Sequence, residues 1–184
     1  MVATLVHDPV VVLALRLGLA LLFASAAGHK LGAPRVFLGV LHAYRLLPPA
    51  LVPAGAIVVT VAEIVVAIAL LLPATRALGA AGAIALLAVY SGAIAINLWR
   101  GRREIDCGCG AAGGRQPINE GLLARNAVLA LAVSIAARPV GPRPLVWIDG
   151  VTLVAAIAVA AAVWTAAHGL AAAAQRVRPV GASR

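Results

Sequence analysis

The chain has 184 residues, of which 63% are hydrophobic and 11% charged, and its mean hydropathy is +1.03. A chain with so few polar residues cannot cover the surface of a water-soluble globular protein. The composition therefore excludes that class and predicts a protein that is surrounded by lipid. The net charge of +9 is not accompanied by interleaved aromatic and basic residues, which argues against nucleic acid as a partner and favours contact with anionic membrane lipid.

Five apolar runs are long enough to cross a membrane, which takes about 20 mostly apolar residues. The first, Pro9 to Ala27, has no Lys or Arg before it, so we expect a retained helix, although the small residues that follow its centre resemble a signal cleavage site. The other runs are residues 50–72, 77–99, 121–137 and 150–174. Backbone groups in lipid must hydrogen-bond internally, so runs this continuous predict an all-α polytopic membrane helix bundle.

The segment between the first two spans, residues 34–47, is too short to cross a membrane. Its apolar side chains, such as Phe37 and Leu41, are interspersed with Arg35 and His42. This amphipathic pattern predicts a helix that lies at the membrane interface. In a five-span arrangement the segment and the third loop share one side of the membrane, so it is either a lid over that loop or a simple connector.

Both cysteines of the chain lie in the third loop, residues 100–118, within the sequence Asp106-Cys107-Gly108-Cys109-Gly110. A disulfide between them would close a ring of three residues, too small to restrict the unfolded chain much. Strain in so small a ring would also make the bond easy to reduce. The spacing therefore predicts a thiol/disulfide switch rather than a structural crosslink.

Charged residues inside the spans should be paired or face a polar cavity, because an isolated charge in lipid is costly. At 1.5 Å per residue, Arg16 lies about 10 Å from the N-terminal end of its helix, and Glu63 about 13 Å from the C-terminal end of the next span. If the two helices are antiparallel, these depths match. We therefore expect a structural ion pair between Arg16 and Glu63, with a proton relay as the alternative interpretation.

A second group of polar residues gathers at the membrane face that carries the cysteine loop. A thiolate is stabilised by a nearby cation, and disulfide exchange needs a proton donor or acceptor. Lys30, Arg125, Glu120 and His29 have this chemistry, and Arg102 and Arg103 would favour a thiolate at Cys107, whereas Asp106 opposes it. The predicted catalytic set is Cys107, Cys109, Arg125, Glu120, Lys30 and Asp106; the alternative for each charged member is a side chain that snorkels to the interface.

Basic residues outside the spans indicate the orientation, because cytoplasmic loops are enriched in Lys and Arg. Ten lie on the side of the first loop, the third loop and the C-terminal tail, against three on the other side. We therefore expect a multi-pass protein of the bacterial plasma membrane, with the cysteine loop on the cytoplasmic side. Cytosolic thiols are kept reduced, so the pair would cycle there. With one span miscounted, the loop would face outward and could pass disulfides to exported proteins.

A family resemblance rests on motifs spread over residues 10–137. They are Arg16 and Phe23 with His29-Lys30-Leu31, the run Tyr44-Arg45-Leu46-Leu47-Pro48, Glu63, the Asp-Cys-Gly-Cys core, and Leu123-Ala124-Arg125-Asn126. Together they resemble the MauE branch of the DoxX-like redox-associated membrane proteins. The family commonly has Phe then Gly after the second cysteine, where this chain has Gly110-Ala111, so an aromatic contact to the disulfide is missing.

The resemblance implies a four-helix membrane domain of DoxX type over residues 1–137, containing the interfacial helix 34–47 and the cysteine loop. Residues 138–174 would then form a linker and a fifth transmembrane helix, and residues 175–184 a basic tail. It also implies a role in methylamine utilisation, in maturation of the disulfide-rich small subunit of methylamine dehydrogenase beside a thioredoxin-like protein. That substrate lies outside the cytoplasm, in conflict with the charge count.

Three functional hypotheses follow. In the first, the chain is a thiol–disulfide oxidoreductase that exchanges electrons with a thioredoxin-like partner, and a lipid quinone as terminal electron carrier is a hypothesis without a motif behind it. In the second, the two cysteines bind or transport Cu(I), with His29 or His42 as further ligands. In the third, the chain is a structural subunit of a membrane complex. Zinc, nucleotide and phosphate motifs are absent from the sequence.

Overall fold

The structure is a computed structural model that describes residues 7–108, 117–139 and 143–177. The helices of these residues are α2 (Pro9–Gly32), α3 (Pro34–Tyr44), α4 (Val52–Leu71), α5 (Arg76–Trp99), α6 (Glu120–Ala136) and α7 (Trp147–Val177), with short 3₁₀ turns at Pro49–Leu51 and Pro73–Thr75. Apart from one isolated bridge between Asp106 and Pro117, the described residues pair into no strand. The all-α prediction is confirmed.

Prolines and one aspartate set the ends of the first helices. Pro9 is the first residue of α2, where its missing N–H costs nothing, and the Asp8 carboxylate caps this helix by accepting a hydrogen bond from the Val10 N–H at 2.9 Å. Pro34 opens α3, which ends where Arg45 adopts a left-handed conformation with φ of 50°. The helical course therefore breaks at Ala33 and again at Arg45, and α3, which lies between these breaks, packs against both α2 and α4.

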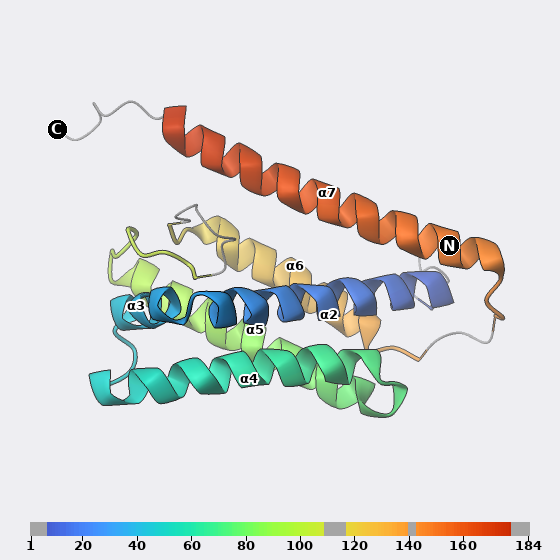
Figure 1. Cartoon of the computed structure of the whole chain (residues 1–184), viewed down its shortest axis with the longest axis horizontal. Helices are drawn as coiled ribbons and strands as arrows, with labels where there is room; N and C mark the ends of the chain where they lie inside the picture. Colours follow the sequence, from blue (N-terminus) through green and yellow to red (C-terminus); the bar gives the residue numbers. More distant parts are fainter. Residues whose placement is uncertain (1–6, 109–116, 140–142, 178–184) are drawn as a thin grey trace. The chain divides into compact units, whose positions relative to one another are not determined.

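Four helices form the bundle of the first compact unit, which spans Met1–Pro144 (Figure 1). They are arranged as a closed ring in which α2 packs against α4 and α6, and α5 packs against the same two helices. The core between them is a cluster that includes Leu19, Phe23, Val66, Leu70, Ala83, Leu87 and Val133. The second compact unit, Leu145–Arg184, contains α7.

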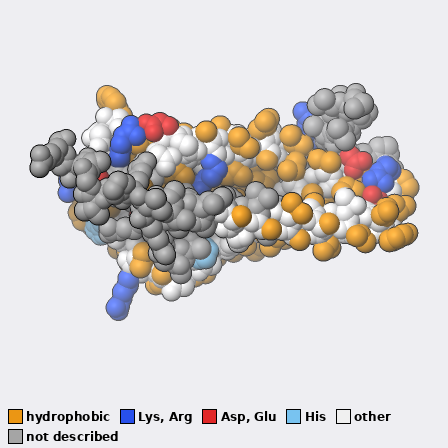
Figure 2. Space-filling view, turned by 90° about the horizontal axis from the view of Figure 1, so that it is seen from above, with side chains coloured by type: hydrophobic (Ala, Val, Ile, Leu, Met, Phe, Trp, Pro, Cys, Tyr) orange, Lys and Arg blue, Asp and Glu red, His pale blue; other side chains and the backbone are white. Residues whose placement is uncertain are grey.

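Within the described residues, three helical segments are long and apolar enough to cross a membrane, and they are Pro9–Gly32, Pro49–Leu71 and Pro73–Trp99. Large apolar side chains also face outward along α4, where Ile57, Val61, Val65 and Ile68 are all exposed. Figure 2 shows hydrophobic side chains spread over the visible face, with charged side chains gathered mainly toward its ends. This surface suits lipid, as the sequence predicted for a polytopic membrane protein.

The predicted spans differ from the helices mainly at their ends. The first was expected to end at Ala27, but α2 continues to Gly32, and the interfacial segment expected over residues 34–47 is helical only to Tyr44. A membrane span was expected at residues 121–137, but α6 has 17 residues, fewer than the other bundle helices, and it is not among the three segments above. The span expected at residues 150–174 lies within α7, which begins earlier, at Trp147.

The antiparallel order of the bundle gives it two ends. One end, called the loop end below, holds the C-terminal ends of α2 and α5, the N-terminal ends of α4 and α6, and α3 (Figure 1). The connection from α5 to α6, which carries the cysteine motif, therefore emerges next to α3. The expectation that these two segments share one side is met within this unit.

Candidate functional site

Backbone contacts between the incoming and outgoing segments hold the base of the cysteine loop together. The Ile118 N–H donates to the Ile105 carbonyl at 2.9 Å, and Asp106 forms the isolated bridge with Pro117. Above this base, the Asp106 carboxylate accepts a hydrogen bond from the Gly108 N–H at 3.0 Å. This is an Asx turn, so Asp106 shapes the turn around Cys107.

Gly108, between the two cysteines, has a φ of +71°, in the left-handed region that favours glycine. A Cβ atom there would lie 3.0 Å from Val40 Cγ1 and 3.9 Å from Phe37 Cδ2. The backbone of the cysteine motif is therefore seated directly on α3. Cys109 and the residues up to 116 fall outside the described part of the chain, so the predicted Cys107/Cys109 pair is described through its first member.

Cys107 lies inside a hydrophobic cluster at the loop end. The cluster also contains Tyr44 of α3, Ile94 of α5 and Leu122 of α6, together with Ile105 and Ile118 of the loop. Only 9% of Cys107 is exposed. These apolar side chains enclose the residue that starts the cysteine motif.

Arg102 and Arg103, which the sequence suggested as cations beside Cys107, have other partners. The Arg102 guanidinium donates to the carbonyls of Ala43 and Tyr44, at 2.6 and 3.3 Å, and to Asn97 Oδ1 at 2.9 Å. It therefore fastens the C-terminal end of α3, where the helix dipole favours a cation, to the end of α5. Asn97 is completely buried beneath it.

Arg103 forms an ion pair with Glu120, with distances of 2.6 and 3.0 Å between guanidinium nitrogens and carboxylate oxygens. The hydrogen bond from Arg103 is the main cause that lowers the pKa of Glu120 to about 2, and it also raises the pKa of Arg103. Both side chains are exposed. Glu120, expected in the catalytic set, is thus a surface carboxylate engaged with the loop.

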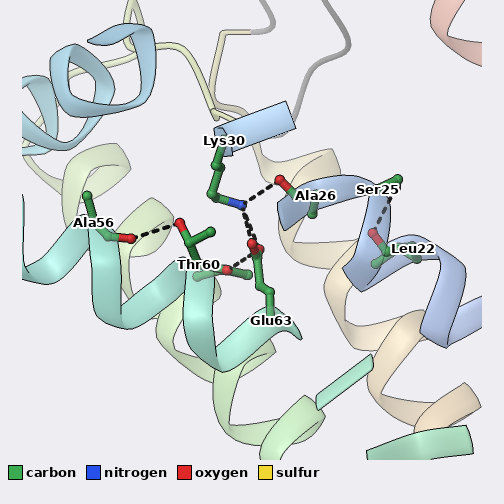
Figure 3. Close-up of polar contacts among 8 residues, drawn as sticks. Leu22, Ser25, Ala26, Lys30, Ala56, Thr60 and Glu63 are labelled. Atoms are coloured by element: carbon green, nitrogen blue, oxygen red, sulfur yellow. Dashed lines mark hydrogen bonds and ion pairs between the residues drawn. The ribbon is translucent and has the colours of Figure 1, made fainter. Parts of the chain in front are cut away.

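Lys30 is turned into the bundle, where its Nζ atom lies 2.6 and 2.8 Å from the two carboxylate oxygens of Glu63. Figure 3 shows the two side chains pointing toward each other from α2 and α4. Tyr90 of α5 donates its hydroxyl hydrogen to the same carboxylate at 2.5 Å. Lys30 is 6% and Glu63 is 1% exposed. Removing one partner of such a buried pair typically costs about 3–5 kcal/mol.

The expected ion pair between Arg16 and Glu63 is wrong, because Glu63 pairs with Lys30 instead. Arg16 lies near the opposite end of the bundle and donates to the carbonyls of Ala136 and Arg138, at 2.8 and 2.7 Å. It satisfies carbonyls at the C-terminal end of α6, which no further helical turn can satisfy. The prediction compared the depths of Arg16 and Glu63 along their helices. It failed because the side chain of Lys30, in the last turn of α2, also reaches Glu63.

The remaining predicted residues are at the loop end but on different elements. Arg125 is half-buried on the second turn of α6, and its neighbour Asn126 is buried and donates to Ser91 Oγ at 3.1 Å. His29 and His42 are exposed. No group of three or more His, Cys, Asp or Glu side chains that could hold a metal ion occurs among the described residues.

Two aromatic residues of this site were missed as site residues. Tyr90 completes the Glu63 carboxylate contacts, and Phe37 lies with its ring centroid 5.1 Å from Lys30 Nζ. The Lys30 ammonium also lies 5.8 Å from the Tyr90 ring centroid. Tyr90 is one of two tyrosines in the chain. A buried hydroxyl in an apolar span needs a hydrogen-bond partner, and this requirement could have identified it.

Comparison with known proteins gives a consistent result. The family model for methylamine utilisation protein MauE matches residues 8–139. Methylamine utilization protein MauE of Paracoccus denitrificans is 45% identical over 130 residues, 70% of this chain and 70% of that protein. The protein of the same name from Paracoccus versutus is 42% identical over 139 residues, 75% of each chain. The one from Methylorubrum extorquens is 41% identical over 132 residues, 72% and 71% of the two chains. No solved structure matches the chain.

Proposed function

This chain belongs to the MauE family, and we propose that it is a membrane-bound thiol–disulfide exchange protein that serves methylamine utilisation. The family's description and the names of its relatives support the metabolic role. The observation that carries the proposed chemistry is the position of Cys107. It starts the Cys-Gly-Cys motif, at an end of the bundle where a partner outside the membrane could meet it.

The exchange needs no resident cofactor. A partner thiolate attacks one sulfur of the Cys107–Cys109 disulfide, a mixed disulfide forms, and the ring bond breaks to release a thiolate that takes up a proton. The partner's second thiol then loses its proton and attacks the mixed disulfide. The partner leaves oxidised, and both cysteines of this chain are left as thiols. This sequence passes a disulfide to the partner, and the reverse sequence takes a disulfide from an oxidised partner by the same steps.

A thioredoxin-like protein is the proposed partner, because its paired thiols match this two-step exchange. The small subunit of methylamine dehydrogenase is the proposed final recipient of the disulfides. Reoxidation of the two thiols would release two electrons and two protons, and a lipid quinone could accept them to become a quinol. The charged residues of the loop end were expected to stabilise a thiolate or to transfer protons, and we propose other roles for most of them.

Arg125 is the charged residue of the predicted set that we keep as a candidate for direct action near the thiols. It is half-buried on α6, the helix that also supplies Leu122 to the cluster around Cys107. Asp106 is proposed to shape the turn, and Glu120 to hold the loop through Arg103. Lys30 is proposed to act through other residues.

The test compares Cys107→Ser, Cys109→Ser and the double variant with the control Ser134→Ala, an exposed change on α6. In a strain that lacks its own MauE protein, we expect growth on methylamine with the control and no growth with the cysteine variants. A thioredoxin-like protein without its resolving cysteine should form a reducible mixed disulfide with the wild-type chain and none with the double variant.

The same experiment separates the other hypotheses. Normal growth with both single cysteine variants would contradict the exchange and indicate a structural subunit of a membrane complex. Copper that copurifies with the reduced wild-type protein and is lost from the double variant, with no mixed disulfide in either, would indicate a Cu(I) site instead.

A further inference from the structure

The buried Lys30–Glu63 pair takes no direct part in the exchange described above, and a buried ion pair is unusual in an apolar bundle. Both side chains are within the four-helix unit and both are nearly inaccessible. The pair lies close to α3, because Lys30 belongs to the last turn of α2, and α3 follows directly along the chain.

Lys30 connects this pair to α3 through Phe37. The Lys30 ammonium lies 5.1 Å from the centroid of the Phe37 ring, within the range of a cation–π contact. Such a contact gains strength where the cation is removed from water, as it is here. The ammonium cannot move away without separating from both oxygens of Glu63, so its position is fixed.

Phe37 in turn supports the cysteine loop. Together with Val40, one turn further along α3, it forms the surface on which Gly108 is seated. Tyr44, another turn along, contacts the cluster that contains Cys107. One face of α3, from Phe37 to Tyr44, therefore covers the described part of the motif at Cys107 and Gly108. The helix is held near its start by Lys30 and at its end by Arg102.

A partner thiol must approach the attacked sulfur directly, whereas Cys107 is buried, with 9% of the residue exposed. We propose that α3 is a lid over Cys107, and that the buried Lys30–Glu63 pair holds this lid closed by fixing Phe37. Lys30, Glu63 and Phe37 are positioning residues in this scheme. The inference rests on the proposed exchange at Cys107, and it specifies how access to that site is controlled.

The test measures how fast Cys107 reacts with a membrane-permeant maleimide in reduced membranes, in a Cys109→Ser background that leaves one thiol. Phe37→Leu keeps an apolar side chain but removes the ring, and it changes no charge. We expect it to raise the alkylation rate on the order of tenfold, since losing a desolvated cation–π contact can shift an opening equilibrium by that much. Phe37→Tyr, which keeps the ring, should stay close to the unmodified rate.

A second variant acts on the other side of the same contact. Lys30→Met combined with Glu63→Gln removes both charges together, so no unpaired charge is left in the bundle, and the new amide can still accept from Tyr90. It should accelerate alkylation as Phe37→Leu does. If one variant fails to accumulate in the membrane, the other still decides.

Unchanged alkylation in a variant that accumulates, or equal acceleration by Phe37→Leu and Phe37→Tyr, would overturn the lid. The measurement does not depend on electron exchange, because maleimide reports access alone. Loss of the mixed disulfide with the expected alkylation pattern would therefore count against the exchange and leave the lid intact.

Discussion

Asp106 and Glu120 show why residue type alone does not assign a role near a thiol. Both are carboxylates close to Cys107 in sequence or on the same face of the membrane. One accepts from the Gly108 N–H and shapes the turn, and the other pairs with Arg103 on the surface. The sequence predicted which residues gather at the loop end. Their partners depend on side-chain directions in a loop, which hydropathy and spacing do not contain.

The Glu120 pair makes a prediction for pH. The pKa of Glu120 is about 2, below its ordinary value of 4.5, so the carboxylate should stay charged in mildly acidic solution. The pair's contribution to stability is present above pH 4.5 and is lost as pH falls through about 2. A ¹³C NMR titration of the Glu120 carboxyl in detergent micelles should give a midpoint near 2.

The matched control for this titration is Arg103→Met. Without the guanidinium, the midpoint should rise toward 4.5, because the hydrogen bond from Arg103 is the largest cause of the shift. Because both side chains are exposed, the substitution should change the overall unfolding midpoint little. A midpoint near 4.5 in the unsubstituted protein would show that the pair does not form in micelles.

At the scale of elements, the helices could be predicted well, because the backbone of a long apolar run in lipid must satisfy its hydrogen bonds internally, as a helix does. Their ends were less predictable. The first apolar run ends at Ala27, yet α2 continues to Gly32, and Lys30 in its last turn pairs with Glu63, which also accepts a hydrogen bond from Tyr90. The mistaken pairing of Arg16 with Glu63 came from matching depths along the helix axes, which does not include the reach of the Lys30 side chain.

The contact between α4 and α5 gives a prediction at this scale. A Cβ at Gly79, near the start of α5, would lie 2.7 Å from backbone atoms of Ala69 and Leu70 in α4. Backbone cannot move aside as a side chain can, so Gly79→Ala should separate the two helices and lower the free energy of unfolding by about 1–3 kcal/mol.

Gly92 provides the control in the same helix, because a Cβ there meets nothing within 4 Å. Gly92→Ala should leave stability unchanged or raise it by up to about 1 kcal/mol, the usual preference of helices for alanine over glycine. Unfolding of the two variants in detergent, followed by circular dichroism, measures both. Equal stability of the two would show that α4 and α5 are not in close contact at Gly79.

At the scale of the whole molecule, two arguments place the loop end on opposite sides of the membrane. The charge count predicts the cytoplasm, whereas a disulfide-rich subunit matured outside the cytoplasm would need the loop outside. The described bundle orders its four helices antiparallel, which puts α3 and the cysteine loop on one side whichever that is.

Whole cells treated with an impermeant maleimide, then lysed and treated with a permeant one, report this side. With the loop in the cytoplasm, only the permeant reagent should label the cysteines, and reductant should be needed for the fraction held as a disulfide. A cysteine placed at residue 74, in the turn between α4 and α5 at the other end of the bundle, serves as a control that should react with the impermeant reagent. The reverse pattern would place the exchange outside and favour direct action on exported proteins.

Arg16 joins the beginning of the bundle to its last turn, and this has a consequence for how the protein is made. Its acceptors are the carbonyls of residues 120 and 122 positions later in the chain. A ribosome releases the first helix into the translocation machinery long before those carbonyls exist. Until the fourth bundle helix has been threaded into the bilayer, this guanidinium must be sheltered by water or by an insertase. A nascent chain stopped short of that point would carry a guanidinium without its two carbonyl acceptors, which is costly in lipid.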